Sequence, residues 1–150
     1  MKVVDTKEYV STLRELVRAG QEVSMPIAGS SMSPFLAHAR DSICFRAPEQ
    51  PLRRGDMVFY QRTNGQFVMH RIYRVRPEGY YIVGDGQTEI EGPIAETQIF
   101  AVVTRVQRKG KWIDATDFWW KFFAGPWLWV IPLRPCLVRL YGLLRFHRNK

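Results

Sequence analysis

Cysteine is scarce in this chain, and no long apolar run opens it. Its two cysteines, Cys44 and Cys136, lie far apart and form no CxxC pair, so neither a disulfide nor a zinc site with ordinary ligand spacing follows from them. We expect two reduced, partly buried thiols and no cofactor or metal. The first 20 residues are charged throughout, a pattern that differs from those of a signal peptide and a membrane anchor.

Acidic residues are missing from residues 118–150. All 14 of them lie in residues 1–117 together with 16 of the 22 basic residues, so this first part is nearly neutral and the final segment carries most of the net charge of +8. The final segment also holds four of the five tryptophans. A near-neutral body without a base-reading motif argues against nucleic acid as the partner.

Short strands separated by turn signals dominate the middle of the chain. Apolar residues from Val10 to Val17 recur at helical spacing and predict a helix over residues 5–19. Runs rich in β-branched and aromatic residues predict six strands, over residues 23–29, 42–48, 56–61, 67–76, 79–85 and 99–109. Asn64-Gly65 predicts a tight hairpin. A chain of 150 residues with these elements is one mainly β domain, either a largely antiparallel sheet or a partly open barrel.

Residues 118–150 form a basic, aromatic tail after the body of residues 1–117. Its apolar run, residues 122–133, is too short to cross a bilayer as one helix and is interrupted by prolines. Residues 136–146 predict a helix. Tryptophan-rich apolar surface beside arginine is typical of a membrane-surface segment, and the alternative is that the tail packs on the sheet and completes the core. We expect a cytoplasmic protein, peripheral on the inner face of the membrane if the tail contacts lipid.

Ser31 and His70 are the residues best suited to chemistry. Ser31 lies in AGSSMSPFL, residues 28–36, where glycine, serine and proline predict a turn that Met32 anchors inward. A serine becomes a nucleophile only when a base takes its proton. Strand alternation places His70 on an apolar face, where burial favours the neutral imidazole that a general base needs. From the residues alone, a core histidine bonded to a carbonyl is the alternative.

Four short motifs occur in a recognisable order: Gly29-Ser30-Ser31-Met32-Ser33-Pro34, Arg54-Gly55-Asp56-Met57-Val58, Val68-Met69-His70-Arg71 and Val83-Gly84-Asp85. Together they resemble the boxes of signal peptidase I and, more broadly, the serine peptidases that include LexA-like self-cleaving proteins. The resemblance implies a LexA/signal-peptidase-like, β-barrel-type catalytic domain. Bacterial members use lysine as the base, whereas His70 in this place is similar to the Ser-His branch of endoplasmic-reticulum and archaeal enzymes.

The resemblance also implies roles for the site residues. Ser31 is the nucleophile that attacks an extended peptide or protein precursor, and its backbone N–H is the expected oxyanion donor. Gly29, Ser30 and Met32 shape the substrate-binding turn, although Gly29 lacks the hydroxyl that many relatives place there.

An acidic residue completes the expected catalytic cluster. Glu91 stands where the Ser-His branch usually has Asp. Asp85 is the alternative, either orienting His70 or bracing its turn. A non-catalytic module that binds a peptide or a membrane on the same fold is the competing hypothesis for the whole protein.

Overall fold

The computed structural model describes the backbone of residues 6–148 and the side-chain surroundings of residues 8–144. Helix α1 (Thr6–Arg18) confirms the helix predicted over residues 5–19, although residue 5 itself lies outside the described residues. Its apolar face buries Val10, Leu13 and Val17 against the sheet. The helix ends at Arg18, and the turn that follows it contains Gly20, whose φ of +90° suits glycine just beyond a helix end.

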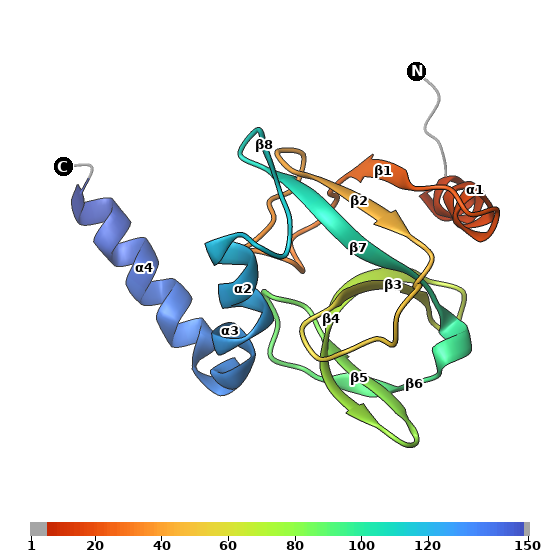
Figure 1. Cartoon of the computed structure of the whole chain (residues 1–150). Helices are drawn as coiled ribbons and strands as arrows, with labels where there is room; N and C mark the ends of the chain where they lie inside the picture. Colours follow the sequence, from red (N-terminus) through yellow and green to blue (C-terminus); the bar gives the residue numbers. More distant parts are fainter. Residues whose placement is uncertain (1–5, 149–150) are drawn as a thin grey trace.

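Eight strands form one antiparallel sheet that does not close (Figure 1). They are β1 (Val23–Pro26), β2 (Ser42–Arg46), β3 (Met57–Gln61), β4 (Phe67–Arg76), β5 (Gly79–Val83), β6 (Glu91–Ile94), β7 (Ile99–Arg108) and β8 (Lys111–Ile113). The order across the sheet is β1-β2-β7-β3-β4-β5-β6, and β8 pairs with β7. The prediction of a mainly β chain is therefore confirmed, with a sheet whose end strands remain open.

Strands β3 and β4 form the hairpin predicted at Asn64-Gly65. Gln61 pairs with Phe67 at its base, and Gly65 has a φ of +91°. The Asn64 side-chain oxygen accepts a hydrogen bond of 2.9 Å from the Gln66 N–H, a local bond that favours the turn. The hairpin fixes the register that places Val58 opposite His70.

The sheet has two strands, β6 and β8, beyond the six predicted, and the first predicted strand ends early. Strand β6 was not expected, because Glu91–Ile94 contains a glycine and a proline; its pairing with β5 comes from the neighbouring strand and not from local propensity. The strand expected over residues 23–29 ends at Pro26, and residues 27–29 lead into the turn that carries Ser31.

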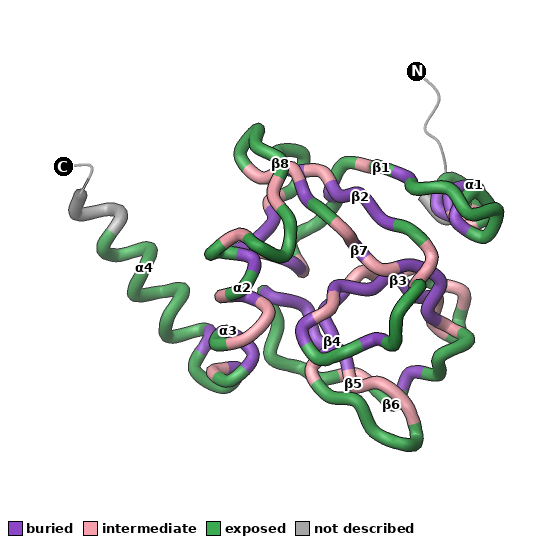
Figure 2. Tube along the Cα trace, in the orientation of Figure 1, coloured by how far each residue is buried: buried purple, intermediate pink, exposed green. Residues whose placement is uncertain are grey.

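Buried residues recur along the strands (Figure 2), and their apolar side chains form separate cores on the two faces of the sheet. Strand β3 shows the division: Met57 and Phe59 join the main core beneath α1, whereas Val58 and Tyr60 join a second core. The second core also contains Ile72, Ile82, Ile94 and Ile99. Because successive side chains point to opposite faces, one strand contributes to both cores.

The tail divides into a packed half and an exposed half. Helices α2 (Phe118–Ala124) and α3 (Pro126–Trp129) bury Trp120, Phe123 and Trp127 in the main core. The 3-10 turn η2 (Ile131–Leu133) and helix α4 (Arg134–Arg148) follow. Packing of the tail on the body is thus confirmed for its first half, whereas every residue from 135 to 144 is exposed. Figure 2 shows α4 extending away from the body.

Membrane-spanning length is not reached by any single helix within residues 6–148. Only the helix pair Phe118–Trp129 and Ile131–Leu144 has sufficient length and apolar content when its two members are taken together, and the pair is bent by 94°.

Candidate active site

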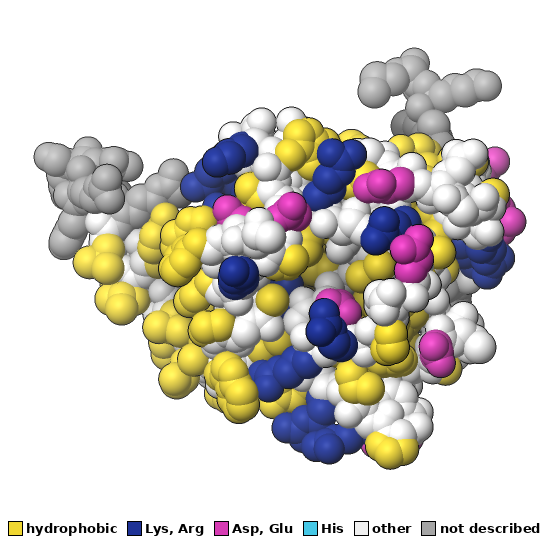
Figure 3. Space-filling view, viewed as in Figure 1, with side chains coloured by type: hydrophobic (Ala, Val, Ile, Leu, Met, Phe, Trp, Pro, Cys, Tyr) yellow, Lys and Arg dark blue, Asp and Glu magenta, His cyan; other side chains and the backbone are white. Residues whose placement is uncertain are grey.

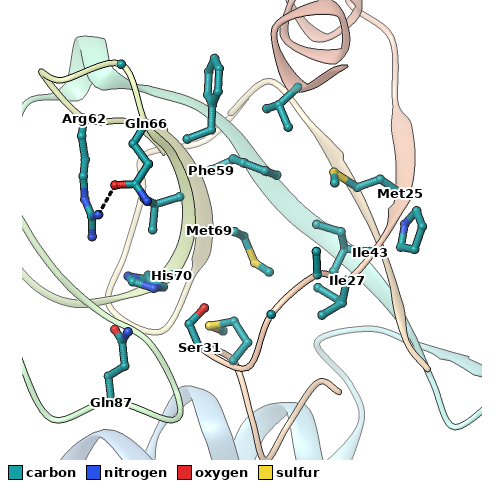
Figure 4. Close-up of a pocket in the computed structure, with 18 of the residues that line it drawn as sticks. Met25, Ile27, Ser31, Ile43, Phe59, Arg62, Gln66, Met69, His70 and Gln87 are labelled. Atoms are coloured by element: carbon teal, nitrogen blue, oxygen red, sulfur yellow. Dashed lines mark hydrogen bonds between the residues drawn. The ribbon is translucent and has the colours of Figure 1, made fainter. Parts of the chain in front are cut away.

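A cavity of about 800 Å³ brings Ser31 and His70 together. One wall comes from the end of β1 and the loop that follows it, and the other from the first half of β4. Figure 4 shows the Ser31 hydroxyl pointing into the cavity that His70 also lines. Apolar side chains line much of the remainder, among them Met25, Ile27, Ile43, Phe59 and Met69.

The turn that carries Ser31 is held from beneath by apolar side chains. Met32, Phe35 and Leu36 are buried in the main core, and the Leu36 N–H donates to the Met32 carbonyl at 2.9 Å. Met32 therefore anchors the turn inward, as expected, and it also lines the cavity. Ser31 itself is only partly buried, so its hydroxyl is presented to the cavity while its neighbours fix the backbone.

Some backbone N–H groups around Ser31 have an acceptor, whereas others, among them those of Ser30, Ser31 and Met32, have none within the described residues. Gly29 has a φ of +84° and its N–H donates to Nδ1 of His38 at 2.8 Å. The Ser30 carbonyl accepts from the Ser33 N–H at 3.0 Å. Within residues 6–148 the Ser31 N–H has no hydrogen-bond acceptor, so it can bind an oxygen that develops negative charge.

The Gly84-Asp85-Gly86 loop packs backbone to backbone against this turn. The Gly86 N–H donates to the Ser31 carbonyl at 2.9 Å. A Cβ at Gly84 would lie 2.5 Å from the Ser31 carbonyl oxygen, and one at Gly86 would lie 2.8 Å from that of Ser33. Glycine is needed at both positions because any side chain would separate the loop from the turn.

Asp85 pairs with Arg71 and not with His70. Both side chains are fully buried, and two hydrogen bonds of 2.8 Å join the guanidinium to the two carboxylate oxygens. Arg71 also donates to the Gly55 carbonyl at 2.9 Å. The motifs at residues 54–58, 68–71 and 83–85 therefore meet at this ion pair. These contacts favour the bracing alternative for Asp85 and do not support its role as the group that orients His70.

His70 is buried, with 5% of its surface exposed. Its ring contacts Tyr60 edge-on, and its strand neighbours Val68 and Ile72 pack in the second core, which confirms the predicted face. Burial, followed by the positive charge of Arg62, lowers the pKa of His70 to about 4, although Glu91 partly opposes the shift. The imidazole is therefore neutral at pH 7.

Neither imidazole nitrogen of His70 has a hydrogen-bond partner among the residues that the structure describes. The carbonyl-bonded core histidine considered as the alternative is thus not observed. Ser31 and His70 share the cavity without a hydrogen bond between them, which is common for catalytic pairs before substrate binds.

Glu91 is hydrogen-bonded to two neighbours of His70 and, among the described residues, not to His70 itself. Its carboxylate accepts hydrogen bonds from the Tyr60 hydroxyl at 2.7 Å and from Nε of Arg62 at 2.7 and 3.1 Å. Burial raises the pKa of Glu91, but these two donors outweigh it and bring the pKa below its usual value. No hydrogen bond joins Glu91 to His70 in the described part of the chain, so Glu91 acts on the imidazole by charge alone.

Three residues near the candidate site were not predicted from the sequence as part of it. Tyr60 and Arg62 surround His70, and strand alternation from Val58 would have indicated Tyr60. Arg134 donates at 2.8 Å to the carbonyls of Gly84 and Gln87, a contact for which the sequence holds no signal. All three are therefore added by the structure to the cluster built around Ser31 and His70.

The structure also describes the cysteines and the grouping of possible metal ligands. Cys44 is buried and Cys136 exposed, so the partial burial predicted for both thiols is wrong. Among the described residues, no group of three His, Cys, Asp or Glu side chains is placed to hold a metal ion.

Comparison of the chain with protein-family models, curated proteins and solved structures yields no match.

Proposed function

We propose that this protein is a serine endopeptidase of the signal peptidase type, with a LexA-like catalytic domain, which cleaves an extended peptide or protein precursor. The observation that carries the proposal is the convergence of Ser31 and His70 in one cavity. Two properties support it: the imidazole is neutral at pH 7, and the Ser31 N–H is free among the described residues.

Each step of the reaction has a group to perform it. His70 accepts the proton of the Ser31 hydroxyl as its Oγ attacks the scissile carbonyl carbon, and the Ser31 N–H binds the resulting oxyanion. His70 then gives the proton to the leaving amine, and an acyl-enzyme remains. Water attacks this ester with His70 again acting as the base, which releases the product and restores Ser31.

Glu91 supports the protonated state of His70 from a distance. Its negative charge favours the imidazolium that forms during each step, whereas Arg62 opposes it. The catalytic unit is therefore a Ser-His dyad with an acidic neighbour and not a hydrogen-bonded triad. Tyr60 keeps its proton, since burial and the hydrogen bond to Glu91 raise its pKa well above the usual range.

The cavity walls suit an extended, apolar peptide. Strand β1 pairs only with β2 in the described sheet, and β4 begins to pair with β5 only at Arg71. The edge of β1 and the first residues of β4 thus hold backbone groups that can bond an added strand. Met25, Ile27 and Met69 between them favour apolar side chains in the substrate.

An acylating probe directed at serine peptidases tests the proposal. We expect mass spectrometry to find the label on Ser31, with none on the Ser31→Ala protein. His70→Ala should lower the labelling rate by about a hundredfold or more, because a general base contributes on that order. Ser33→Ala, in the same turn, is the matched control and should label normally.

The competing candidate is a non-catalytic peptide-binding module, because the apolar cavity lining and the free edges of β1 and β4 suit peptide binding without any reaction. Absence of labelling by several probes in a folded sample that still binds apolar peptides would replace the peptidase proposal with this one.

A further inference from the structure

Both halves of the tail contribute exposed apolar side chains to one side of the molecule. We use the name tail surface for the exposed side chains of Trp119, Trp129, Leu133, Leu137, Leu140 and Leu144. Trp129 is 73% exposed and Leu144 is 61% exposed. In Figure 3, hydrophobic side chains gather on the side of the molecule where α2, α3 and α4 lie. Exposed apolar groups gathered in this way mark an interaction site.

Helix α4 carries its part of the tail surface as one stripe. Leu137, Leu140 and Leu144 recur at positions i, i+3 and i+7, which places them on the same side of a helix. No residue from 135 to 144 is buried, so the stripe faces no other part of the described chain. A short helix with no packing partner is only marginally stable in water, and a surface that covers the stripe would stabilise it.

Charge distinguishes the possible partners of the tail surface. Residues 118–150 contain six basic residues and no acidic one. A second copy of the chain would bring two such segments together with no carboxylate to pair them. The guanidinium of Arg54, from the body, lies 4.2 Å from the centre of the Trp129 ring, which adds a further cation beside the exposed aromatic residues. An anionic surface with an apolar interior matches this arrangement.

We propose that the tail surface binds an anionic lipid bilayer, with α4 lying in the headgroup region. Tryptophan and arginine are the residues that favour this region. Arg134, at the root of α4, holds the carbonyls of Gly84 and Gln87, so a bound helix would place the Ser31 cavity at a fixed position near the membrane. The proposal is independent of the peptidase reaction, because it concerns a different surface.

Vesicle flotation with the full chain tests this proposal. We expect binding to phosphatidylcholine vesicles that contain about one third phosphatidylglycerol, little binding to pure phosphatidylcholine, and weakening by salt. Leu140→Gln/Leu144→Gln should reduce binding by about tenfold or more, because it removes apolar area that the bound helix buries in the bilayer. Leu16→Gln alters an exposed leucine of α1 and should bind as the wild type does.

A second variant keeps the proposal testable if the leucine variant does not fold. Lys121→Glu/Arg139→Glu reverses two exposed charges of the tail and should also weaken binding to the anionic vesicles. Failure of the folded wild type to float with these vesicles would overturn the proposal, as would normal binding by both variants. Self-association without lipid that Leu140→Gln/Leu144→Gln abolishes, with no flotation of the wild type, would identify a second copy as the partner instead.

Discussion

His70 owes its neutral state to burial and to the charge of Arg62. Its pKa is lowered to about 4 by these two causes in that order, whereas a histidine in an unfolded chain has a pKa of about 6.5. The unfolded chain therefore takes up the proton first as the pH falls. The contribution of His70 to folded-state stability is complete above about pH 6.5 and is lost as the pH falls towards 4.

Arg62→Gln tests this account. We expect the pKa of His70 to rise, because the substitution removes a positive charge and leaves the Glu91 carboxylate without its cationic partner. NMR titration of the His70 ring measures the pKa directly. If the proposed peptidase reaction holds, activity falls as the pH drops through about 4 in the wild type, and this fall moves to higher pH in the variant.

Arg76→Gln is the matched control for this titration, since Arg76 is an exposed arginine at the far end of β4, the strand that carries His70. An unchanged pKa of His70 in Arg62→Gln would show that the guanidinium does not act on the imidazole.

At the scale of elements, α4 is joined to the loop that supports the serine turn. Arg134, its first residue, is buried and donates to the carbonyls of Gly84, Gln87 and Trp127. The loop in turn donates to the Ser31 carbonyl through the Gly86 N–H. The tail thus takes part in shaping the candidate active site.

Arg134→Met should loosen this connection. We expect the free energy of unfolding to fall by about 3 kcal/mol, because hydrogen bonds to a charged donor are lost and buried carbonyls remain unpaired. The Gly86 amide should also exchange its hydrogen faster, which native-state hydrogen exchange detects. Arg139→Met, an exposed arginine of the same helix, should change neither quantity. Equal exchange in the two variants would contradict the proposed connection.

At the scale of the whole molecule, the body of residues 1–117 and the first half of the tail pack together. Asp117, the last residue of the body, accepts hydrogen bonds from the backbone N–H groups of Trp119 and Trp120 and so caps α2. The body and the tail are therefore joined within one helix and its cap. The helices that follow bury Trp120, Phe123 and Trp127 in the same core as α1 and the sheet. The body and the first half of the tail therefore share one core.

Truncation separates the two halves of the tail. A chain of residues 1–117 should lose cooperative unfolding, since each buried aromatic residue contributes about 3–5 kcal/mol and a domain has only about 5–15 kcal/mol in total. A chain of residues 1–138 should keep a thermal midpoint near that of the full chain, because it removes only exposed residues of α4 from the described part. A stable, cooperative fold of residues 1–117 would show instead that the tail is dispensable.

Local patterns in the sequence were enough to predict the first helix, most of the strands and the face on which His70 lies. The helix at Thr6–Arg18, the strand at Phe67–Arg76 and the hairpin at Asn64-Gly65 depend on periodicity and turn chemistry within a few residues. The inward anchor Met32 also followed from its place between two serines in a turn. The family resemblance and the reaction inferred from it stay predictions for the experiments above.

Only the tertiary structure decided the partners of the charged groups and the fate of the tail. Asp85 meets Arg71 across 14 residues of sequence, and Arg134 meets Gly84 across 50. Such pairs form because the folding sheet brings distant backbone segments together, and a buried charge then requires whichever opposite charge or carbonyl lies within reach. For the same reason β6 became a strand beside β5, and half of an apolar tail entered the core while α4 remained outside it.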